Sequence, residues 1–285
     1  MNDLFTKETV AFVERNDPRP FFVYLNYTVP HAELRAPDEA VAEFRGKFPE
    51  QPFTNPNADA KLAGARADLP SLGYRSQPAP KAAFVAMVTR MDRDIGRLAD
   101  VIRSRGIERQ TLLLFISDNG PHREGGGDPV FFTSNGGLRG IKRDLYEGGI
   151  RVPLIASWPG TIPSGRVSDH VWAHWDVLPT LAELAGARTP AGLDGMSMAR
   201  ALRGERQPTH PFFYWEFHER GFQQAVRTDQ WKAVRLKTNS LLELYDLDTD
   251  RNEQRDVAAA NPQVVAKVES FLRTARTVSD RWPVK

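Results

Sequence analysis

The sequence of 285 residues contains no cysteine. Disulfide bonds, zinc sites with thiolate ligands and thiol nucleophiles are therefore excluded. Long apolar runs are also absent: residues 112–116 form one of the purest, and none approaches the ~18 residues that a membrane-spanning helix needs. We therefore expect no membrane span. Residues 1–17 lack a basic region followed by an apolar one, so they do not resemble a secretory signal and instead predict an amphipathic helix.

An excess of charge of one sign is missing as well. The chain has 38 Lys and Arg residues against 36 Asp and Glu residues, a formal net charge of +2. A protein that binds nucleic acid or a membrane surface over much of its area is expected to be more basic than this. Apolar residues make up 41% of the chain and charged residues 26%, which are ordinary values for a globular protein.

Predicted strands alternate with predicted helices in the first two thirds of the chain. Residues 20–27 (PFFVYLNY), 111–120 and 152–158 are apolar runs too short for helices, and their patterns favour strands buried on both faces. Residues 81–105 repeat apolar side chains at steps of three and four, and residues 176–185 predict another helix. This order predicts an α/β fold in which helices flank a mostly parallel sheet.

The other segments differ in character. Residues 32–80 are rich in proline and lack periodicity, which indicates either a functional lid or disorder. After Gly204 the chain consists of short aromatic runs that partly alternate, followed by an amphipathic helix at 262–277. We therefore predict a small antiparallel sheet with a packing helix. The predicted domains are residues 1–203, an α/β domain, and residues 204–285, a small α+β subdomain.

Candidate functional residues follow the predicted strands. Asp118 and Asn119 come directly after the run at 112–116 and offer adjacent hard oxygen donors suited to Ca²⁺ or Mg²⁺. The alternative is that Asp-Asn-Gly only forms a tight turn. His31 follows the run at 20–27 and could act as a general acid or base, or be an ordinary loop histidine.

Lys142 lies in a glycine-dense segment that also contains Arg139, Arg143 and Arg151. Glycines permit close backbone approach, and the cations suit an oxyanion such as sulfate or phosphate. The alternative is a solvated basic loop.

Three partial motifs do not satisfy the chemistry they suggest. Residues 246–257 have the acidic spacing of an EF-hand loop, but Arg251 replaces the required glycine and Val257 the bidentate glutamate. Residues 195–199 (GMSMA) approach a nucleophile elbow but lack its last glycine and a preceding strand. The chain also contains no GxxxxGK phosphate-binding loop.

Several blocks together resemble the sulfatase family of the alkaline-phosphatase superfamily. They include RPFFVYLNYTVPHAE, MDRDIGRLADVI, LLLFISDNGPHREGG, SNGGLRGIKRDLYEGGIRVPLIASWPG and WDVLPTLAELAG. The later blocks DGMSMARALRG, VRTDQWKAVR and LELYDLDTDRNEQRDVA resemble the C-terminal part of the family. The resemblance extends from residue 3 to about residue 272 in the order of the family. It implies an arylsulfatase-like hydrolase of sulfuric esters.

The resemblance also implies roles for individual residues. Sulfatases bind one divalent cation, usually calcium, and attack the sulfate ester with a formylglycine made from cysteine or serine. By motif, Asp118 and Asn119 match the second pair of metal ligands. His31 matches the histidine that contacts the ester and protonates the leaving oxygen, and Lys142 matches the lysine that neutralises the sulfate, so both are substrate-binding and catalytic candidates.

The chain departs from the family in one respect. The nucleophile of the family lies in a C/S-x-P-x-R segment, next to an Asp-Asp pair that supplies the first two metal ligands. Neither is present: Ser157 begins SWPGT and Ser76 begins SQPAP. We therefore expect a truncated C-terminal portion of a sulfatase that lacks its N-terminal half and the nucleophile. Such a chain should bind its cation weakly and be inactive alone.

Two other functions remain open. The chain could belong to a phosphodiester or phosphonate monoester hydrolase of the same superfamily, or be a non-catalytic anion-binding fragment or subunit. The expected partner is an aryl or carbohydrate sulfate ester, and no nucleic acid. We expect the 32–80 segment and the C-terminal sheet to choose between these esters. The family resemblance implies a periplasmic or secreted location.

Overall fold

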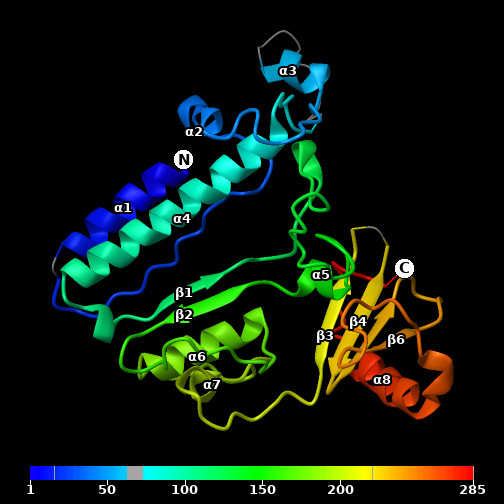
Figure 1. Ribbon diagram of the computed structural model, residues 1–285. Helices are drawn as coiled ribbons and strands as arrows, with labels where there is room; N and C mark the ends of the chain where they lie inside the picture. Colours follow the sequence, from blue (N-terminus) through cyan, green and yellow to red (C-terminus); the bar gives the residue numbers. More distant parts are fainter. Residues whose placement is uncertain (16, 63–72, 220, 285) are drawn as a thin grey trace. The chain divides into compact units, whose positions relative to one another are not determined.

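The computed structural model describes residues 1–15, 17–62, 73–219 and 221–284. The chain is a mixed α/β protein with two compact units (Figure 1). Unit 1 contains Met1–Thr111 and His122–Phe132, and unit 2 contains Leu112–Pro121 and Thr133–Lys285. The chain therefore passes between the units three times. The predicted boundary between residues 203 and 204 stays a prediction.

Unit 1 is built around the long helix α4 (Pro80–Ser104), which lies beside α1 (Asn2–Glu14) in Figure 1. This confirms the helix predicted from the three- and four-residue steps. A small apolar core forms where α2 (Asp38–Ala42) packs against the first turns of α4. Three alanines on α4, Ala82, Ala83 and Ala86, allow this close approach. They lie in the same buried cluster as Leu34 and Val41.

The strand predicted at residues 20–27 is wrong. The segment has no regular secondary structure and pairs with no strand among the described residues. The side chains of Phe22 and Tyr24 are 72% and 79% exposed, so the aromatic run is not buried on both faces. Its apolar composition suggested a strand, but a strand also requires a hydrogen-bonding neighbour.

The proline-rich connection at 32–80 is partly ordered. Besides α2 it contains α3 (Pro56–Leu62), and Phe53 and Gln77 form an isolated antiparallel bridge. Residues 63–72 of this predicted lid lie outside the described residues. A short turn of 3₁₀ helix, η1 (Glu108–Gln110), ends the main part of unit 1, and a second one, η2 (Glu124–Gly126), belongs to its later segment.

The first sheet of unit 2 has two described strands, β1 (Leu113–Ile116) and β2 (Leu154–Ser157). They pair antiparallel, with Ile116 opposite Leu154, so the expected parallel pairing is wrong for these strands. The connection between them leaves and re-enters at the same end of the sheet, which requires opposite directions. That connection contains Asp118, Asn119 and Lys142, and also α5 (Glu147–Ile150).

The rest of unit 2 contains short helices and a second sheet. After β2 come η3 (His174–Asp176), α6 (Val177–Leu184) and α7 (Ala199–Arg203). The strands β3 (Phe213–Phe217), β4 (Gln223–Thr228), β5 (Trp231–Arg235) and β6 (Glu243–Asp246) then form an antiparallel meander. After η4 (Ala258–Ala260), helix α8 (Pro262–Thr274) buries Val268 and Leu272 against this sheet. The predicted antiparallel sheet with a packing helix is confirmed.

Within the described residues, no helix is both long enough and apolar enough to cross a bilayer.

Candidate functional site

Asp118 and Asn119 occupy the turn that follows β1. The side-chain Nδ2 of Asn119 donates a hydrogen bond of 2.6 Å to Oδ1 of Asp118. The Ser117 hydroxyl donates to the backbone carbonyl of Asn119 at 3.1 Å. Asp118 is exposed and Asn119 is half-buried. The contact between the two side chains uses the amide nitrogen, so the amide oxygen and the second carboxylate oxygen are the hard donors suited to a cation.

Glycine contacts bring the Lys142 segment to this turn. The Gly120 amide donates to the Gly149 carbonyl at 2.9 Å, and the Lys142 amide donates to the Pro121 carbonyl at 2.8 Å. A Cβ atom added to Gly120 would lie 2.0 Å from the Gly148 carbonyl oxygen, so no other residue fits there without movement. Lys142 is therefore placed next to the Asp118–Asn119 turn by the backbone itself.

The arginines near Lys142 have structural partners. Arg143 Nε lies 2.6 Å from Glu219 Oε2. Arg151 Nη1 lies 3.4 Å from Glu147 Oε2. Arg139 donates to the hydroxyls of Tyr146 and Tyr245. These guanidinium groups therefore stabilise the segment around Lys142, which is itself half-buried.

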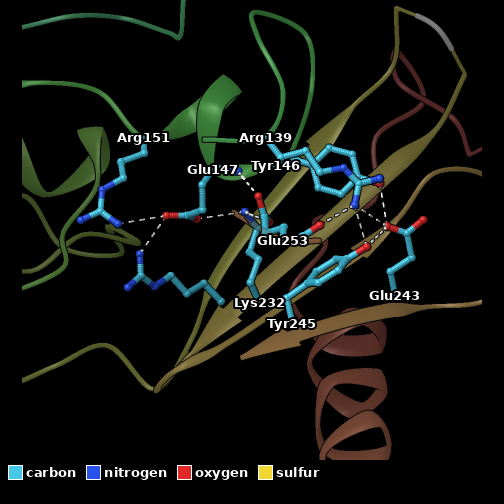
Figure 2. A network of polar contacts seen from close by, with 9 residues as sticks. Arg139, Tyr146, Glu147, Arg151, Lys232, Glu243, Tyr245 and Glu253 are labelled. Atoms are coloured by element: carbon cyan, nitrogen blue, oxygen red, sulfur yellow. Dashed lines mark hydrogen bonds and ion pairs between the residues drawn. The ribbon is translucent and has the colours of Figure 1, made fainter. Parts of the chain in front are cut away.

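A buried ion network holds α5 against the second sheet (Figure 2). Lys232 is fully buried, and its Nζ lies 3.1 Å from Glu147 Oε1 and 3.4 Å from Glu253 Oε1. Glu253 Oε2 also accepts a hydrogen bond of 2.7 Å from the Glu147 amide. Burial opposes ionisation of Glu147, but the charges of Lys232 and Arg227 outweigh it and lower its pKa. Burial dominates at Glu253 and raises its pKa.

Arg139 extends this network. Its guanidinium donates to the Tyr245 hydroxyl at 2.8 Å, the Tyr146 hydroxyl at 3.0 Å and the Glu253 carbonyl at 2.7 Å. Both tyrosine hydroxyls donate to Glu243 Oε2, at 2.6 and 2.7 Å. Burial, followed by the Glu243 carboxylate, raises the pKa of both tyrosines, so they stay neutral donors. Residues on both sides of Lys142 are thereby anchored to the sheet (Figure 2).

His31 lies in unit 1, on the turn that follows residues 20–27. Its amide donates to the Thr28 carbonyl at 3.0 Å. Its Nδ1 lies 2.7 Å from the carbonyl oxygen of Ala32. Because a carbonyl only accepts, Nδ1 is the protonated nitrogen, and Nε2 is the nitrogen that can exchange a proton elsewhere. The imidazole is exposed.

His122, which no motif singled out, lies beside the candidate residue His31. Its ring centroid lies 5.1 Å from that of His31, with 33° between the ring planes. Its Nε2 donates to the Pro30 carbonyl at 3.2 Å, and its Nδ1 accepts a hydrogen bond from the Glu124 amide at 3.2 Å. The only signal in the sequence is the position of His122 directly after DNGP, which does not reveal a partner.

The structure thus groups the predicted residues in two sets. Asp118, Asn119 and Lys142 share one region of unit 2, and His31 is held beside His122 in unit 1. In the described part of the chain, no group of three or more His, Asp or Glu side chains could hold a metal ion. The Asp118–Asn119 pair fits a divalent cation by donor chemistry but supplies only two ligands. The assigned roles stay predictions.

Two family profiles match the chain. Sulfatase matches residues 1–187, and N-sulphoglucosamine sulphohydrolase, C-terminal, matches residues 140–277. Steryl-sulfatase of Mus musculus is 31% identical over 231 residues, covering 80% of this chain and 31% of the relative. A sulfatase of Formosa agariphila is 30% identical over 268 residues, covering 85% and 43%. The chain therefore spans less than half the length of these curated relatives.

Solved structures agree with the profiles. The crystal structure of Ps i-CgsB in complex with k-i-k-neocarrahexaose has a TM-score of 0.73 and 28% identity, covering 95% of this chain and 54% of that one. The phosphonate monoester hydrolase of Agrobacterium radiobacter has a TM-score of 0.68 and 20% identity, covering 100% and 64%, and shows a shared fold alone. With the Sulfatase profile matching residues 1–187, the chain belongs to the sulfatase family and has its alkaline-phosphatase-like fold.

Proposed function

We propose that this chain supplies the cation-binding and sulfate-neutralising part of a sulfuric-ester hydrolase. The observation that supports this proposal is the hydrogen bond of 2.8 Å between the Lys142 amide and the Pro121 carbonyl, next to the Asp118–Asn119 turn. A cationic side chain and two hard oxygen donors in one region suit a sulfate group, which needs both charge neutralisation and a cation at its oxygens.

Asp118 and Asn119 would hold the cation, Ca²⁺ or Mg²⁺, through Oδ2 of the carboxylate and the amide oxygen. When bound, the cation would withdraw charge from a sulfate oxygen as a Lewis acid. The hydrogen bond between Asn119 and Asp118 orients both donors before binding. Because affinity follows the number and charge of the ligands, we expect weak binding by these two residues alone.

Lys142 would neutralise the sulfate, and His31 would protonate the leaving oxygen of the ester. The Nδ1–H of His31 donates to the Ala32 carbonyl at 2.7 Å, so the imidazolium form would deliver its Nε2 proton to the leaving oxygen and become the neutral Nδ1–H tautomer. His122, anchored at both of its nitrogens, would limit rotation of the His31 ring. A positioned imidazole of this kind typically contributes about 10²–10⁴-fold to the rate of proton transfer.

We further propose a carbohydrate sulfate ester as the substrate. The solved relative with 28% identity was crystallised with an oligosaccharide, k-i-k-neocarrahexaose. An aryl sulfate is the alternative within the same activity. A phosphonate monoester is the alternative suggested by the fold shared with the Agrobacterium radiobacter enzyme.

Binding to the purified chain tests the proposal without requiring turnover. In the presence of Ca²⁺, 4-nitrophenyl sulfate should bind the wild type, and Lys142→Met should weaken binding by about 10-fold or more, the usual effect of removing a charged hydrogen-bond donor. Asp118→Asn should weaken binding of Ca²⁺ itself, measured by calorimetry. Lys237→Met is the matched control, because Lys237 is an exposed lysine of unit 2.

Two results would contradict the proposal. If Lys142→Met and Lys237→Met bind 4-nitrophenyl sulfate equally well, Lys142 has no role in binding sulfate. If a 4-nitrophenyl phosphonate monoester binds more tightly than the sulfate and depends more on Lys142, the phosphonate function is favoured instead.

A further inference from the structure

A hollow of about 350 Å³ opens on unit 1. It lies between the chain that precedes α4 and the glycine-rich segment that follows His122. Pockets of small ligands in proteins begin at about 300 Å³, so the hollow has room for a sugar unit. Six of the residues that line it are Gln51, Phe53, Arg123, Gly127, Asp128 and Val130.

The acidic wall of the hollow is fixed in place. Asp128 Oδ2 lies 3.0 Å from Nζ of Lys81, whose side chain is only 4% exposed. Asp128 Oδ1 accepts a hydrogen bond of 3.0 Å from the Phe131 amide. That backbone bond and the Lys81 charge lower the pKa of Asp128, which keeps the carboxylate ionised. Asp128 is therefore a stable acceptor for hydroxyl groups.

Two glycines give this wall its shape. Gly126 has a φ of +92°, and an added Cβ atom would lie 2.8 Å from Pro80 Cβ and 2.9 Å from Phe53 Cβ. An added Cβ on Gly127 would lie 2.7 Å from the His122 carbonyl oxygen. The backbone can approach its neighbours this closely only because both residues lack a side chain.

The rim of the hollow is cationic. Lys81 and Asp128 neutralise one another, which leaves the exposed guanidinium of Arg123 as the additional charge. Within the described part of the chain, Arg123 forms no ion pair. A guanidinium binds planar or tetrahedral oxyanions through two donors at once. Val130, 71% exposed, and Phe53 provide apolar surface beside it, which suits the C–H face of a sugar ring.

One turn of backbone, η2, lies between the hollow and the residue that follows the candidate acid. The two glycines of η2 face opposite neighbours. A Cβ atom added to Gly125 would lie 3.1 Å from Ala32 Cβ, whereas one added to Gly126 would lie 2.9 Å from Phe53 Cβ. Ala32 is the residue after His31, and its carbonyl accepts the His31 Nδ1–H. The hollow and the His31–Ala32 segment therefore lie on the two sides of one backbone turn.

We propose that this hollow is a subsite for an acidic sugar ring, sulfated or carboxylated. The neighbouring sugar ring of the same oligosaccharide would carry the sulfate ester that reaches His31. Arg123 would bind the acidic group, Asp128 would accept hydrogen bonds from ring hydroxyls, and Phe53 and Val130 would contact the apolar face. The inference rests on the proposed function, which places the ester at His31. It adds that the substrate is an oligosaccharide and that it carries a second anionic group beside the reacting ester.

The test uses hexasaccharides from carrageenan, heparin and chondroitin sulfate, titrated into the purified 285-residue chain by calorimetry. We expect at least one to bind, and Arg123→Gln to weaken the tightest binder about 10-fold, the effect of losing a charge-assisted pair. Arg103→Gln is the matched control. Arg103 is an exposed arginine paired with Asp100 at 2.6 Å, at the other end of α4 from Lys81, or ~33 Å along the helix.

The identity of the acidic group can be read in the same experiment. Carrageenan hexasaccharide is acidic only through sulfate, whereas chemically desulfated heparin hexasaccharide retains its carboxylates. If Arg123→Gln weakens binding of the carrageenan hexasaccharide, the group bound by Arg123 is a sulfate. If it weakens binding of the desulfated heparin hexasaccharide, that group is a carboxylate. Either result supports the subsite.

The subsite is overturned if no hexasaccharide binds, or if Arg123→Gln and the wild type bind all of them equally. These failures differ from failure of the proposed function. Loss of 4-nitrophenyl sulfate binding in Lys142→Met, combined with no effect of Arg123→Gln on any hexasaccharide, removes the subsite and leaves the sulfate-binding proposal intact.

Discussion

Lys232 is fully buried, yet its ammonium group lies between two carboxylates rather than among apolar side chains. Removing a charge from water costs several kcal/mol, and nearby opposite charges and hydrogen bonds offset that cost only when the geometry is good. Here Glu147 also contacts Arg151 and Arg227, each at 3.4 Å. The residues that fix the Lys142 segment are therefore mutually dependent, and removal of one leaves the others unpaired.

We predict that Lys232→Met lowers the free energy of unfolding by about 3–5 kcal/mol, because Glu147 and Glu253 then lose their buried cation. Urea unfolding of the purified chain measures this. Lys237→Met should change the value by no more than about 0.5 kcal/mol, since the side chain is exposed. Adding Glu147→Gln to Lys232→Met should restore part of the loss. A loss below about 1 kcal/mol for the single variant would mean that water reaches the network.

Acid should weaken this network through Glu147. Burial raises the pKa of its carboxyl, but Lys232 and then Arg227 lower it by more, so the net shift is downward. A carboxyl with a lowered pKa stabilises the fold at pH values above its unfolded pKa, about 4.3, and loses this contribution as the pH falls through the folded value. The raised pKa of Glu253, caused first by burial, acts in the opposite sense.

The corresponding prediction compares wild type with Glu147→Gln. The wild type should be more stable at pH 7, and the difference should narrow as the pH is lowered below about 4.3. Urea unfolding at several pH values provides the measurement. Glu205→Gln, at an exposed position of unit 2, should show a difference that does not change with pH. A gap between wild type and Glu147→Gln that stays constant on acidification would contradict the assigned direction.

At the scale of elements, the end of β1 and the helix α5 meet through backbone alone. Gly120 contacts Gly148 and Gly149 so closely that no side chain fits between the two segments. A Cβ atom added to Gly148 would lie 2.3 Å from the Gly140 carbonyl oxygen, and one added to Gly149 would lie 2.1 Å from the Asp144 carbonyl oxygen. The glycines of this region therefore allow three segments to pack closely: the turn at Gly120, residues 140–144 and residues 148–149. Lys142 lies in the second of them.

Gly120→Ala should consequently disturb the packing and the cation-binding turn together. We expect a loss of about 1–3 kcal/mol in unfolding free energy, because an overpacked site must shift its backbone, and weaker Ca²⁺ binding by the adjacent Asp118 and Asn119. Gly96→Ala is the control: an added Cβ there meets nothing within 4 Å, and alanine should stabilise the α4 helix by about 0.5–1 kcal/mol. Equal stability of Gly120→Ala and wild type would contradict the close contact.

At the scale of the whole molecule, the chain has the fold of its family but not every group that the proposed chemistry needs. It contains no cysteine and no serine in an S-x-P-x-R segment, so none of its 285 residues matches the nucleophile of the resemblance. Under the proposed function, binding of a sulfate and cleavage of its ester are separable, since covalent catalysis requires the attacking atom.

We therefore expect the purified chain to release no 4-nitrophenol from 4-nitrophenyl sulfate above the buffer rate, with or without added Ca²⁺. The same preparation should bind the ester in the calorimetric experiment, which shows that the protein is folded and competent. Absorbance of 4-nitrophenolate measures the release. Turnover that is abolished by Lys142→Met would show that another group in the chain acts as the nucleophile.

Residues 81–105 show how far local patterns lead. Their apolar steps of three and four predicted a helix, and α4 occupies Pro80–Ser104. The aromatic alternation after residue 204 likewise predicted the antiparallel sheet, and the final amphipathic pattern predicted α8. These patterns succeed because helix and strand periodicity depends on neighbours a few residues apart.

Residues 20–27 and 152–158 show where local patterns fail. Both are apolar, but the first has no strand partner within the described residues, and the second contains β2, which pairs antiparallel with β1. Strand pairing depends on a second segment that is distant in sequence, and the direction of pairing depends on the path of the connection. Apolar composition carries neither piece of information.

The candidate site divides in the same way. The motifs around Asp118, Asn119, Lys142 and His31 were readable in the chain, as was the absence of a C/S-x-P-x-R segment. The placement of His122 beside His31, and the burial of Lys232 between Glu147 and Glu253, were not. A buried charge is tolerated only where residues far apart in sequence arrive together to neutralise it, so its position follows from folding and cannot be deduced from its neighbours along the chain.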